Sequence, residues 1–201
     1  ALGPGWPDVR LLALFAVADT IKDTSRQAIA ELKALGVTSI MLTGDNAATA
    51  KTIAAQAGID EARGNLLPEH KLDAIKDLQR LHGLTAMTGD GINDAPALAQ
   101  SNIGFAMGGA GTDTAMEAAD VVVMNDDLRR IPETIRLSRL THAILWQNIS
   151  LALGIKAIFF VLAVFGGATM WMAVFADMGA SLLVVANGLR LLKVDVSQKT
   201  G

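Results

Sequence analysis

Two short runs of the chain place aspartate beside glycine directly after an apolar stretch. The first is Thr43-Gly44-Asp45, and the second is the run TGDGIND at residues 88–94. A carboxylate beside glycine-exposed N–H groups suits Mg²⁺ and phosphate together, because Mg²⁺ takes few protein carboxylates plus phosphate oxygens and water. Backbone N–H groups and lysine neutralise phosphoryl charge. Lys71, just after Pro68, is a candidate for that second role.

Both runs also have a purely structural interpretation, because Asp-Gly pairs are common in turns and Lys71 could be a solvated surface charge. For residues 43–46 alone, TGDN, the two interpretations stay open. For the longer run TGDGINDAPA at 88–97 the chemical interpretation is favoured. A turn does not require Asp, Asn and Asp at that spacing.

The elements that must position these residues alternate between short apolar runs and amphipathic runs. Strands are predicted at 11–18, 38–42, 84–88, 103–107 and 121–124. Helices are predicted at 23–35, 47–57, 68–81, 94–100 and 114–119. This alternation implies parallel crossovers and therefore an α/β fold with a doubly wound parallel sheet. Ligands of such sheets bind at the C-terminal ends of the strands, where both aspartate-bearing loops fall.

The last third of the chain has the composition of membrane segments. Residues 143–189 contain only two ionisable side chains, Lys156 and Asp177. Gly166-Gly167 and Thr169 divide this stretch into two spans of roughly 20 residues, each enough to cross a hydrocarbon core. Basic residues flank both outer ends, at positions 129, 130, 136, 139, 190 and 193. The pattern predicts a transmembrane helical hairpin with both ends on the cytoplasmic side.

Lys156 and Asp177 each lie about ten residues from the turn, which is about 16 Å along a helix and close to the membrane centre. An ionisable group there costs about 2.5–3.5 kcal/mol and is a functional hypothesis by default. One interpretation is an ion pair that fixes the helix register. The other is that Asp177 is a hard oxygen ligand for a divalent cation and Lys156 supplies the counter-charge when the site is empty. A carboxylate suits Zn²⁺, whereas Cu(I) prefers sulfur ligands.

Other features of the sequence exclude some classes of function or do not distinguish between them. A net charge of −3 gives no support to nucleic-acid binding. The absence of cysteine leaves the redox compartment open. The first ten residues do not have the pattern of a signal peptide. Asn148 and Asn187 are expected to form hydrogen bonds between the two apolar helices, and the three histidines (His70, His82, His142) are expected on the surface.

In order and spacing, TGDN at 43–46, PEHK at 68–71 and TGDGINDAPAL at 88–98 resemble the phosphorylation domain of P-type ATPases. That domain has the haloacid-dehalogenase-like fold. The resemblance implies that Asp90 binds Mg²⁺ and that Asn93 and Asp94 hold this site together. It also implies that Thr43, Gly44 and Lys71 contact an aspartyl phosphate, and it makes Asp45 a further catalytic residue of the first run. Asp19 resembles the hinge to the nucleotide-binding domain.

The segment DMGA at 177–180, with Lys156 in the preceding helix, resembles the zinc-, cadmium- and lead-exporting subgroup. The copper-exporting subgroup stays as an alternative, because Met170, Met172 and Met178 lie close to Asp177 in the sequence. The Met-x-x-Ser-Ser pattern of that subgroup is absent, however, and methionine is common apolar filler.

The resemblance covers essentially the whole chain, but it implies only the last third or so of a pump. Residues 1–20 would end the nucleotide-binding domain and form the hinge, 21–127 would complete the phosphorylation domain, 128–193 would hold the juxtamembrane and transmembrane helices, and 194–201 would be a cytoplasmic tail. No Asp-Lys-Thr-Gly-Thr run, which carries the family's nucleophile, is present. The chain alone is therefore expected to be inactive.

As part of the complete pump, the chain would work with Mg²⁺ and ATP and transport Zn²⁺, Cd²⁺ or Pb²⁺. Its partners would be the lipid bilayer and the remainder of the pump, in the bacterial inner membrane. Two other classes stay open. A membrane-tethered phosphatase of the same fold would need an Asp-x-Asp motif near the N-terminus, which the sequence lacks. A non-catalytic regulatory fragment has no feature in its favour.

Overall fold

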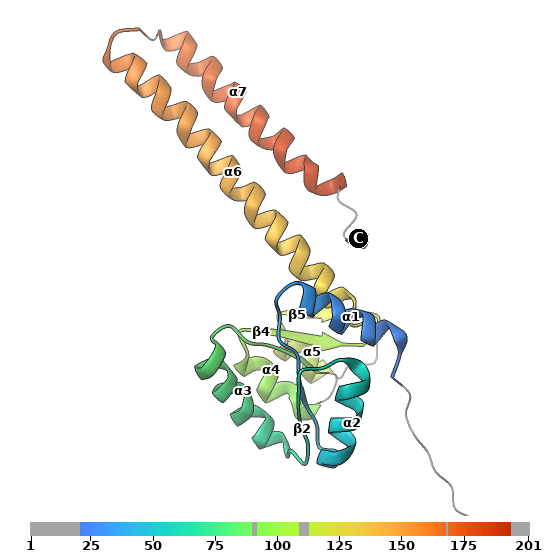
Figure 1. Ribbon diagram of the computed structural model, residues 1–201. Helices are drawn as coiled ribbons and strands as arrows, with labels where there is room; N and C mark the ends of the chain where they lie inside the picture. The colour runs from blue at the N-terminus through green and yellow to red at the C-terminus, as the bar shows by residue number, and fades with distance from the viewer. Residues whose placement is uncertain (1–20, 90–91, 109–112, 168, 194–201) are drawn as a thin grey trace, which may run out of the picture.

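The computed structural model describes residues 21–89, 92–108, 113–167 and 169–193. An α/β domain lies at one end, and two long antiparallel helices extend away from it (Figure 1). The predicted strand at 11–18, the hinge residue Asp19 and the magnesium candidate Asp90 lie outside the described residues.

The described strands are parallel, as predicted, and they form two separate sheets. β1 (Ile40–Leu42) pairs with β2 (Glu61–Arg63), and β3 (Ala86–Gly89), β4 (Ile103–Met107) and β5 (Val121–Val123) form a second sheet in the order β3-β4-β5. Among the described residues β1 and β3 do not pair directly, so the two sheets remain separate. Strand β2 was not predicted, since its sequence, EAR, has no apolar run.

The helices of the domain begin and end within one or two residues of their predicted bounds, the usual uncertainty at helix ends. They are α1 (Asp23–Ala34), α2 (Ala47–Ala57), α3 (Pro68–His82), α4 (Ala95–Gln100) and α5 (Asp113–Ala118). Local chemistry explains several of the ends. The Asn46 side chain accepts a hydrogen bond from the Ala48 N–H and caps α2, while Gly58 ends that helix with φ 78°. Pro68 stands in the first turn of α3.

Two groups of buried side chains hold the domain together. The first joins α3, β3 and α4 through Ile75, Met87, Ala97 and Leu98, and Leu42 of β1 packs against it. The second consists of Phe105, Met107, Val123 and Ile131. Ile131 belongs to the first turn of the following long helix. The start of that helix is therefore part of the core of the domain.

Helix α6 (Arg130–Val164) contains 35 residues and is about 52 Å long. The sequence pattern predicts a juxtamembrane helix before a membrane span, but the structure has one continuous helix. Pro132 causes no break because it lies in the first turn, where its missing N–H costs nothing. After the turn at Gly166, α7 (Met170–Gly188) returns and ends in a short 3₁₀ segment, η2 (Leu189–Lys193).

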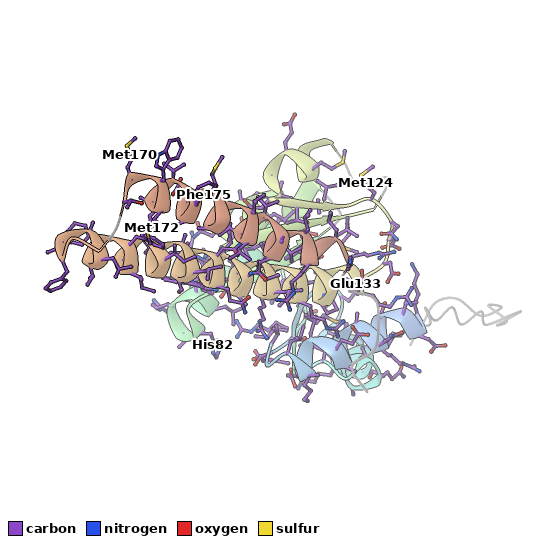
Figure 2. All side chains as sticks on the ribbon, turned by 90° about the horizontal axis from the view of Figure 1, so that it is seen from above. His82, Met124, Glu133, Met170, Met172 and Phe175 are labelled. Atoms are coloured by element: carbon purple, nitrogen blue, oxygen red, sulfur yellow. The ribbon has the colours of Figure 1, made fainter. Side chains whose placement is uncertain are left out.

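Both long helices are long and apolar enough to cross a membrane. Their apolar side chains are largely exposed, and Met170 projects outward from α7 with 84% of its surface accessible (Figure 2). Such a surface on two adjacent helices is typical of membrane-spanning segments rather than of a soluble domain. The prediction that these residues form a hairpin of two helices is confirmed.

Candidate functional site

The loop after β1 folds into a compact turn around Thr43. The Thr43 hydroxyl donates a hydrogen bond to Oδ2 of Asp45 at 3.0 Å, and the Asp45 backbone N–H donates back to that hydroxyl at 3.1 Å. Side-chain and backbone groups of these residues therefore point toward one another at the C-terminal end of a parallel strand, where ligands bind in this type of sheet.

The residues after β2 hold this loop in place through the backbone. Thr43 donates to the Arg63 carbonyl at 3.0 Å, Asn65 donates to the Asp45 carbonyl at 2.6 Å, and Leu66 donates to the Thr43 carbonyl at 3.0 Å. Gly64 is needed for this approach, since a Cβ there would lie 2.6 Å from Cα of Ala47. This backbone support of the Thr43 loop was not predicted from the sequence. The Gly64-Asn65 pair is the local feature that could have indicated it.

Lys71 and Asp94 form an ion pair although 23 residues separate them. The Nζ atom of Lys71 lies 2.7 Å from Oδ1 of Asp94, and only 17% and 12% of the two side chains are exposed. Lys71 stands in the first turn of α3, and Asp94 lies at the junction of a short 3₁₀ turn with α4. The interpretation of Lys71 as a solvated surface charge is therefore wrong.

Asp94 is the one buried charged residue among those that the structure describes. Gly89, at the end of β3, makes room for it, because a Cβ at Gly89 would lie 2.7 Å from the Asp94 Cβ and 2.8 Å from its Oδ2. The carboxylate is thus held close to the strand end by a glycine on one side and an ammonium on the other. Asn93 is exposed beside it.

This arrangement fits a magnesium ion together with phosphate. Mg²⁺ binds through one or two carboxylates and completes its shell with phosphate oxygens and water. The described residues bring one carboxylate, Asp94, to the end of β3 and contain no group of three or more His, Asp or Glu side chains that would hold a metal by themselves. A site of this kind depends on an anionic ligand, for which Lys71 supplies the opposite charge.

The two sequence-predicted groups of site residues share one core. Leu42, directly before Thr43, packs against the cluster that contains Met87 of β3. The Leu66 N–H donates to the Thr43 carbonyl, and the next residue, Leu67, is the N-cap of the helix that carries Lys71. The structure therefore joins the Thr43 loop to the Lys71–Asp94 pair through a short, hydrogen-bonded segment.

A second candidate site lies between the two long helices. The Nζ atom of Lys156 on α6 lies 3.6 Å from Oδ1 of Asp177 on α7, so the two residues meet at matching depth, as predicted. Both side chains are 66% exposed. They border a cavity of about 290 Å³ that is otherwise lined by apolar side chains of both helices: Ile155, Phe159, Phe160, Ala163, Ala173, Ala176 and Ala180.

Amide side chains tie the helices together nearer the domain. Nδ2 of Asn187 donates to Oδ1 of Asn148 at 2.8 Å and to Oε1 of Gln147 at 3.3 Å. Nη1 of Arg190 donates to Oδ1 of Asn187 at 3.0 Å. The predicted hydrogen bond between Asn148 and Asn187 is confirmed. This contact and the Lys156–Asp177 pair together fix the register of the hairpin.

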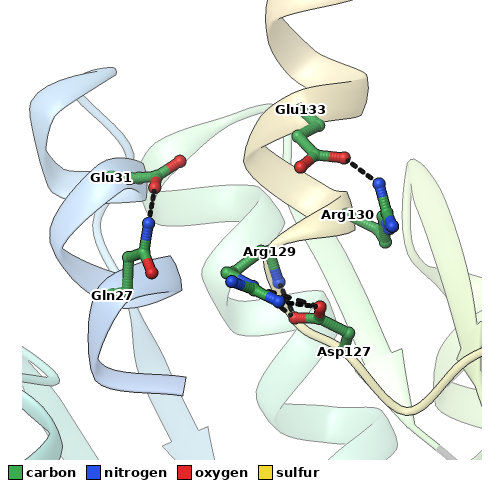
Figure 3. A network of polar contacts seen from close by, with 6 residues as sticks. All are labelled: Gln27, Glu31, Asp127, Arg129, Arg130 and Glu133. Carbon is green, nitrogen blue, oxygen red and sulfur yellow. Dashed lines mark hydrogen bonds and ion pairs between the residues drawn. The ribbon is translucent and has the colours of Figure 1, made fainter. Parts of the chain in front are cut away.

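Ion pairs and hydrogen bonds surround the base of α6 (Figure 3). The Arg129 guanidinium donates to both carboxylate oxygens of Asp127, at 2.7 Å from Nη2 to Oδ2. This hydrogen bonding holds the pKa of Asp127 below its ordinary value, although partial burial of the carboxylate opposes the effect. The same contact raises the pKa of Arg129. Both groups are therefore charged near neutral pH.

The three histidines are exposed, as expected. Nδ1 of His70 accepts a hydrogen bond from the Leu67 N–H at 3.3 Å, and Nε2 of His142 accepts one from the Trp146 indole at 3.1 Å. His82 lies at the end of α3. None of them lies in a group of metal-binding side chains among the described residues.

Comparison with known families decides the family of the soluble part. A sequence profile of the haloacid dehalogenase-like hydrolases matches residues 2–102, which is about half of the chain. The chain belongs to this family. The dehalogenase-like fold expected from the motifs is confirmed, and the candidate site residues of this domain lie after β1, in the first turn of α3 and after β3.

Individual relatives extend the similarity beyond the dehalogenase-like domain into the hairpin. The chain is 54% identical over 186 residues to a probable cadmium-transporting ATPase of Listeria monocytogenes, covering 92% of this chain and 26% of that relative. It is 48% identical over 183 residues to a zinc/cadmium/lead-transporting P-type ATPase of Escherichia coli (strain K12), covering 91% of this chain and 25% of that relative. The chain thus spans about a quarter of the length of these curated relatives.

A solved structure agrees with the sequence relatives. The crystal structure of a zinc-transporting PIB-type ATPase in an E2.Pi state matches with a TM-score of 0.80 at 48% identity, over 87% of this chain and 28% of that chain. The expected resemblance to the C-terminal portion of zinc- and cadmium-transporting P-type ATPases is therefore confirmed.

Proposed function

We propose that this chain is part of an ATP-driven exporter of zinc, cadmium or lead that works through an aspartyl-phosphate intermediate. The observation that carries the proposal is the arrangement of two charged sites on one continuous structure. The Lys71–Asp94 pair lies in the dehalogenase-like domain, and the Lys156–Asp177 pair lies between two helices of membrane-spanning length. Helix α6 begins in the core of that domain and carries Lys156.

In this proposal, residues 21–127 are the C-terminal part of the phosphorylation domain, and residues 128–193 are its juxtamembrane and transmembrane extension. The chain contains no Asp-Lys-Thr-Gly-Thr run, so the aspartate that becomes phosphorylated would belong to another part of the complete protein. ATP would likewise bind to a domain outside this chain.

The residues of the domain would act on the phosphoryl group by charge and hydrogen bonding. Lys71 is poised to neutralise phosphoryl oxygens, because its side chain is only 17% exposed and Asp94 fixes the direction of its ammonium group. The Thr43 hydroxyl and the Gly44 N–H would donate to the same oxygens. For that, Thr43 must give up its present hydrogen bond to Asp45, which would then reorient with the loop.

Magnesium would be held by Asp90, with Asn93 and Asp94 supporting the site. When bound, the ion would neutralise the negative charge that develops on the phosphoryl oxygens. Asp94 would face two cations in that state, Lys71 and the metal. Its position beside Gly89 leaves the carboxylate close to the end of β3, where the phosphate is expected.

The transported ion would bind at Asp177. Its carboxylate is a hard oxygen ligand that suits Zn²⁺, and the remaining ligands would come from helices outside this chain. Lys156 would compensate the charge of Asp177 when no metal is bound, and its 3.6 Å separation from Asp177 permits this. The choice of cadmium and lead beside zinc rests on the names of the relatives.

The proposed location is the bacterial inner membrane, with the phosphorylation domain and the C-terminus on the cytoplasmic side. Arg190 and Lys193 follow α7, and Arg136 and Arg139 lie near the base of α6, so basic residues flank the domain-side ends of both helices. Lipid would cover part of the exposed apolar surface of the hairpin, and the other helices of the pump would cover the rest.

Metal-stimulated ATP hydrolysis by the complete protein in lipid vesicles tests the proposal. We expect Zn²⁺, Cd²⁺ and Pb²⁺ to stimulate hydrolysis and Cu(I) to leave it at the basal rate. Stimulation by Cu(I) alone would favour the copper-exporting alternative. Phosphatase activity that is independent of every transported metal would favour the membrane-tethered phosphatase.

A further inference from the structure

Helix α1 (Asp23–Ala34) lies between the phosphate-site helix α2 and the membrane helix α6. It contacts both, and Figure 1 shows it beside the base of α6. The roles proposed above for the magnesium and phosphate residues and for the Lys156–Asp177 pair do not involve α1. Its contacts are polar as well as apolar, and they lie at both of its sides.

Toward α6, the contacts of α1 are directional. Oε2 of Glu31 lies 2.8 Å from Nη2 of Arg136, although 105 residues separate them, and only 20% and 21% of the side chains are exposed. Nε2 of Gln27 donates to the other oxygen of Glu31 at 2.9 Å (Figure 3). Nη2 of Arg139 donates to the Leu35 carbonyl, at the C-terminal end of α1, at 3.0 Å. Two arginines one helical turn apart on α6 therefore hold α1.

Toward the phosphate site, α1 packs against α2, and an ion pair with an exposed lysine also joins it to the segment that carries the Thr43 loop. Nζ of Lys33 lies 2.9 Å from Oδ1 of Asp60, and Oδ2 of Asp60 accepts the Ser39 N–H at 3.0 Å. Ser39 directly precedes β1, and Thr43 directly follows that strand. At the other end of the loop, Asn46 caps α2, the helix that α1 contacts.

We propose that α1 couples the phosphate site to the membrane hairpin and that the Glu31–Arg136 pair is the contact that transmits the movement. This inference rests on the proposed function of the two sites. When the Thr43 loop rearranges around a phosphoryl group, α2 and the Ser39–Asp60 contact move with it. Helix α1 then shifts with α2, and its contacts with Arg136 and Arg139 displace the base of α6.

The geometry of α6 carries such a movement to the metal pair. Lys156 lies 20 residues after Arg136, about 30 Å along an uninterrupted helix. No proline stands between these positions, so this stretch lacks the commonest cause of a sharp helix kink. A small rotation at the base of α6 therefore displaces Lys156 relative to Asp177.

The low exposure of the Glu31–Arg136 pair gives it a role that a surface ion pair lacks. Exposed pairs contribute little and exchange with water. Here Glu31 is bonded on both oxygens, so loss of Arg136 leaves a carboxylate with one partner in a poorly solvated place. The contact therefore holds α1 against α6 in a defined geometry, so that a movement of either helix acts on the other.

The test uses the complete protein in lipid nanodiscs and beryllium fluoride, an analogue of the phosphoryl group. Hydrogen exchange of residues 130–193 is measured with and without the analogue. We expect the analogue to change exchange in the hairpin of the wild type and the change to be roughly three- to tenfold smaller in Arg136→Gln and Glu31→Gln. The charge-reversed double variant Glu31→Arg/Arg136→Glu should restore it.

Arg130→Gln is the matched control, because Arg130 pairs with Glu133 one turn away on the same helix and does not hold α1. It should respond like the wild type. An undiminished response in both single variants, or no response in the wild type, would overturn the coupling role of α1. Since the readout does not involve a transported metal, a pump that moved no zinc, cadmium or lead would refute the proposed function without deciding the coupling.

Discussion

The ammonium of Lys71 lies 2.7 Å from the carboxylate of Asp94, in a place where less than a fifth of either side chain is exposed. A charge with few surrounding water molecules acts on a neighbouring anion more strongly than a solvated one. The pair therefore fixes a positive charge at the strand end where phosphate is expected. It also gives the proposed magnesium and phosphate site a structural argument that does not depend on motif similarity.

Loss of the Lys71 charge should impair phosphoryl chemistry in the complete protein. We expect Lys71→Met to lower the rate of phosphoenzyme turnover by about 10²- to 10³-fold, the range seen when one positioned donor is removed from a site of developing negative charge. Rapid-quench measurement of the phosphoenzyme checks this. Lys76→Met, on the exposed face of the same helix, is the control and should turn over normally. Equal rates in the two variants would remove Lys71 from the site.

A methyl group at Gly89 should disturb the proposed magnesium site without removing a charged residue. In Gly89→Ala the new Cβ would lie 2.7 Å from the Asp94 Cβ, so the carboxylate must shift. We expect a several-fold higher Mg²⁺ concentration for half-maximal phosphorylation. Gly188→Ala, where a Cβ meets nothing within 4 Å, is the control. An unchanged Mg²⁺ titration of Gly89→Ala would contradict the placement of Asp94 at this site.

The Asp127–Arg129 contact should make stability depend on pH in a defined direction. Because the folded-state pKa of Asp127 lies below its ordinary value of 3.8, the pair stabilises the fold above that pH, and the contribution is lost as the pH falls through the folded-state pKa. Asp127→Asn should therefore lower the Tm at pH 7, and its difference from the wild type should shrink below about pH 4.

Thermal unfolding of the complete protein between pH 3 and 7 measures this difference. Asp126→Asn is the matched control, since Asp126 is 69% exposed. A difference between Asp127→Asn and the wild type that stays constant across this range would show that the carboxylate charge is irrelevant.

Asn187 should hold the hairpin in register. Its amide bonds to Asn148 and Gln147 on the facing helix, and each such bond between membrane helices contributes about 0.6 kcal/mol. We expect Asn187→Leu to weaken cross-linking between cysteines placed at positions 156 and 177. Ser181→Ala is the control, because Ser181 bonds only to the Asp177 carbonyl of its own helix. Undiminished cross-linking in Asn187→Leu would assign the register to apolar packing.

Features with a local signal could be predicted from the sequence. Pro68 and Gly58 mark helix ends. Lys156 and Asp177 are two charges in an apolar stretch, at equal distances from a glycine turn, and this spacing predicts that they lie side by side. The motif runs gave Lys71 and Asp94 as members of one site.

Features that depend on distant parts of the chain could not be predicted. Strand β2 has a polar sequence and exists because its backbone pairs with β1. The Glu31–Arg136 pair joins residues 105 positions apart, and each of them looks like an ordinary surface charge on an amphipathic helix. The exposure of such residues depends on packing between elements, which no local pattern records.

The most direct test of the central claim is metal-stimulated ATP hydrolysis by the complete protein carrying Asp177→Ala. Lys156 would then face no carboxylate, and the transported cation would lose an oxygen ligand. We predict that hydrolysis in lipid vesicles stays at the basal rate at every Zn²⁺ and Cd²⁺ concentration, while phosphorylation by inorganic phosphate persists. Full stimulation by Zn²⁺ in the Asp177→Ala variant would contradict the proposal that Asp177 binds the transported ion.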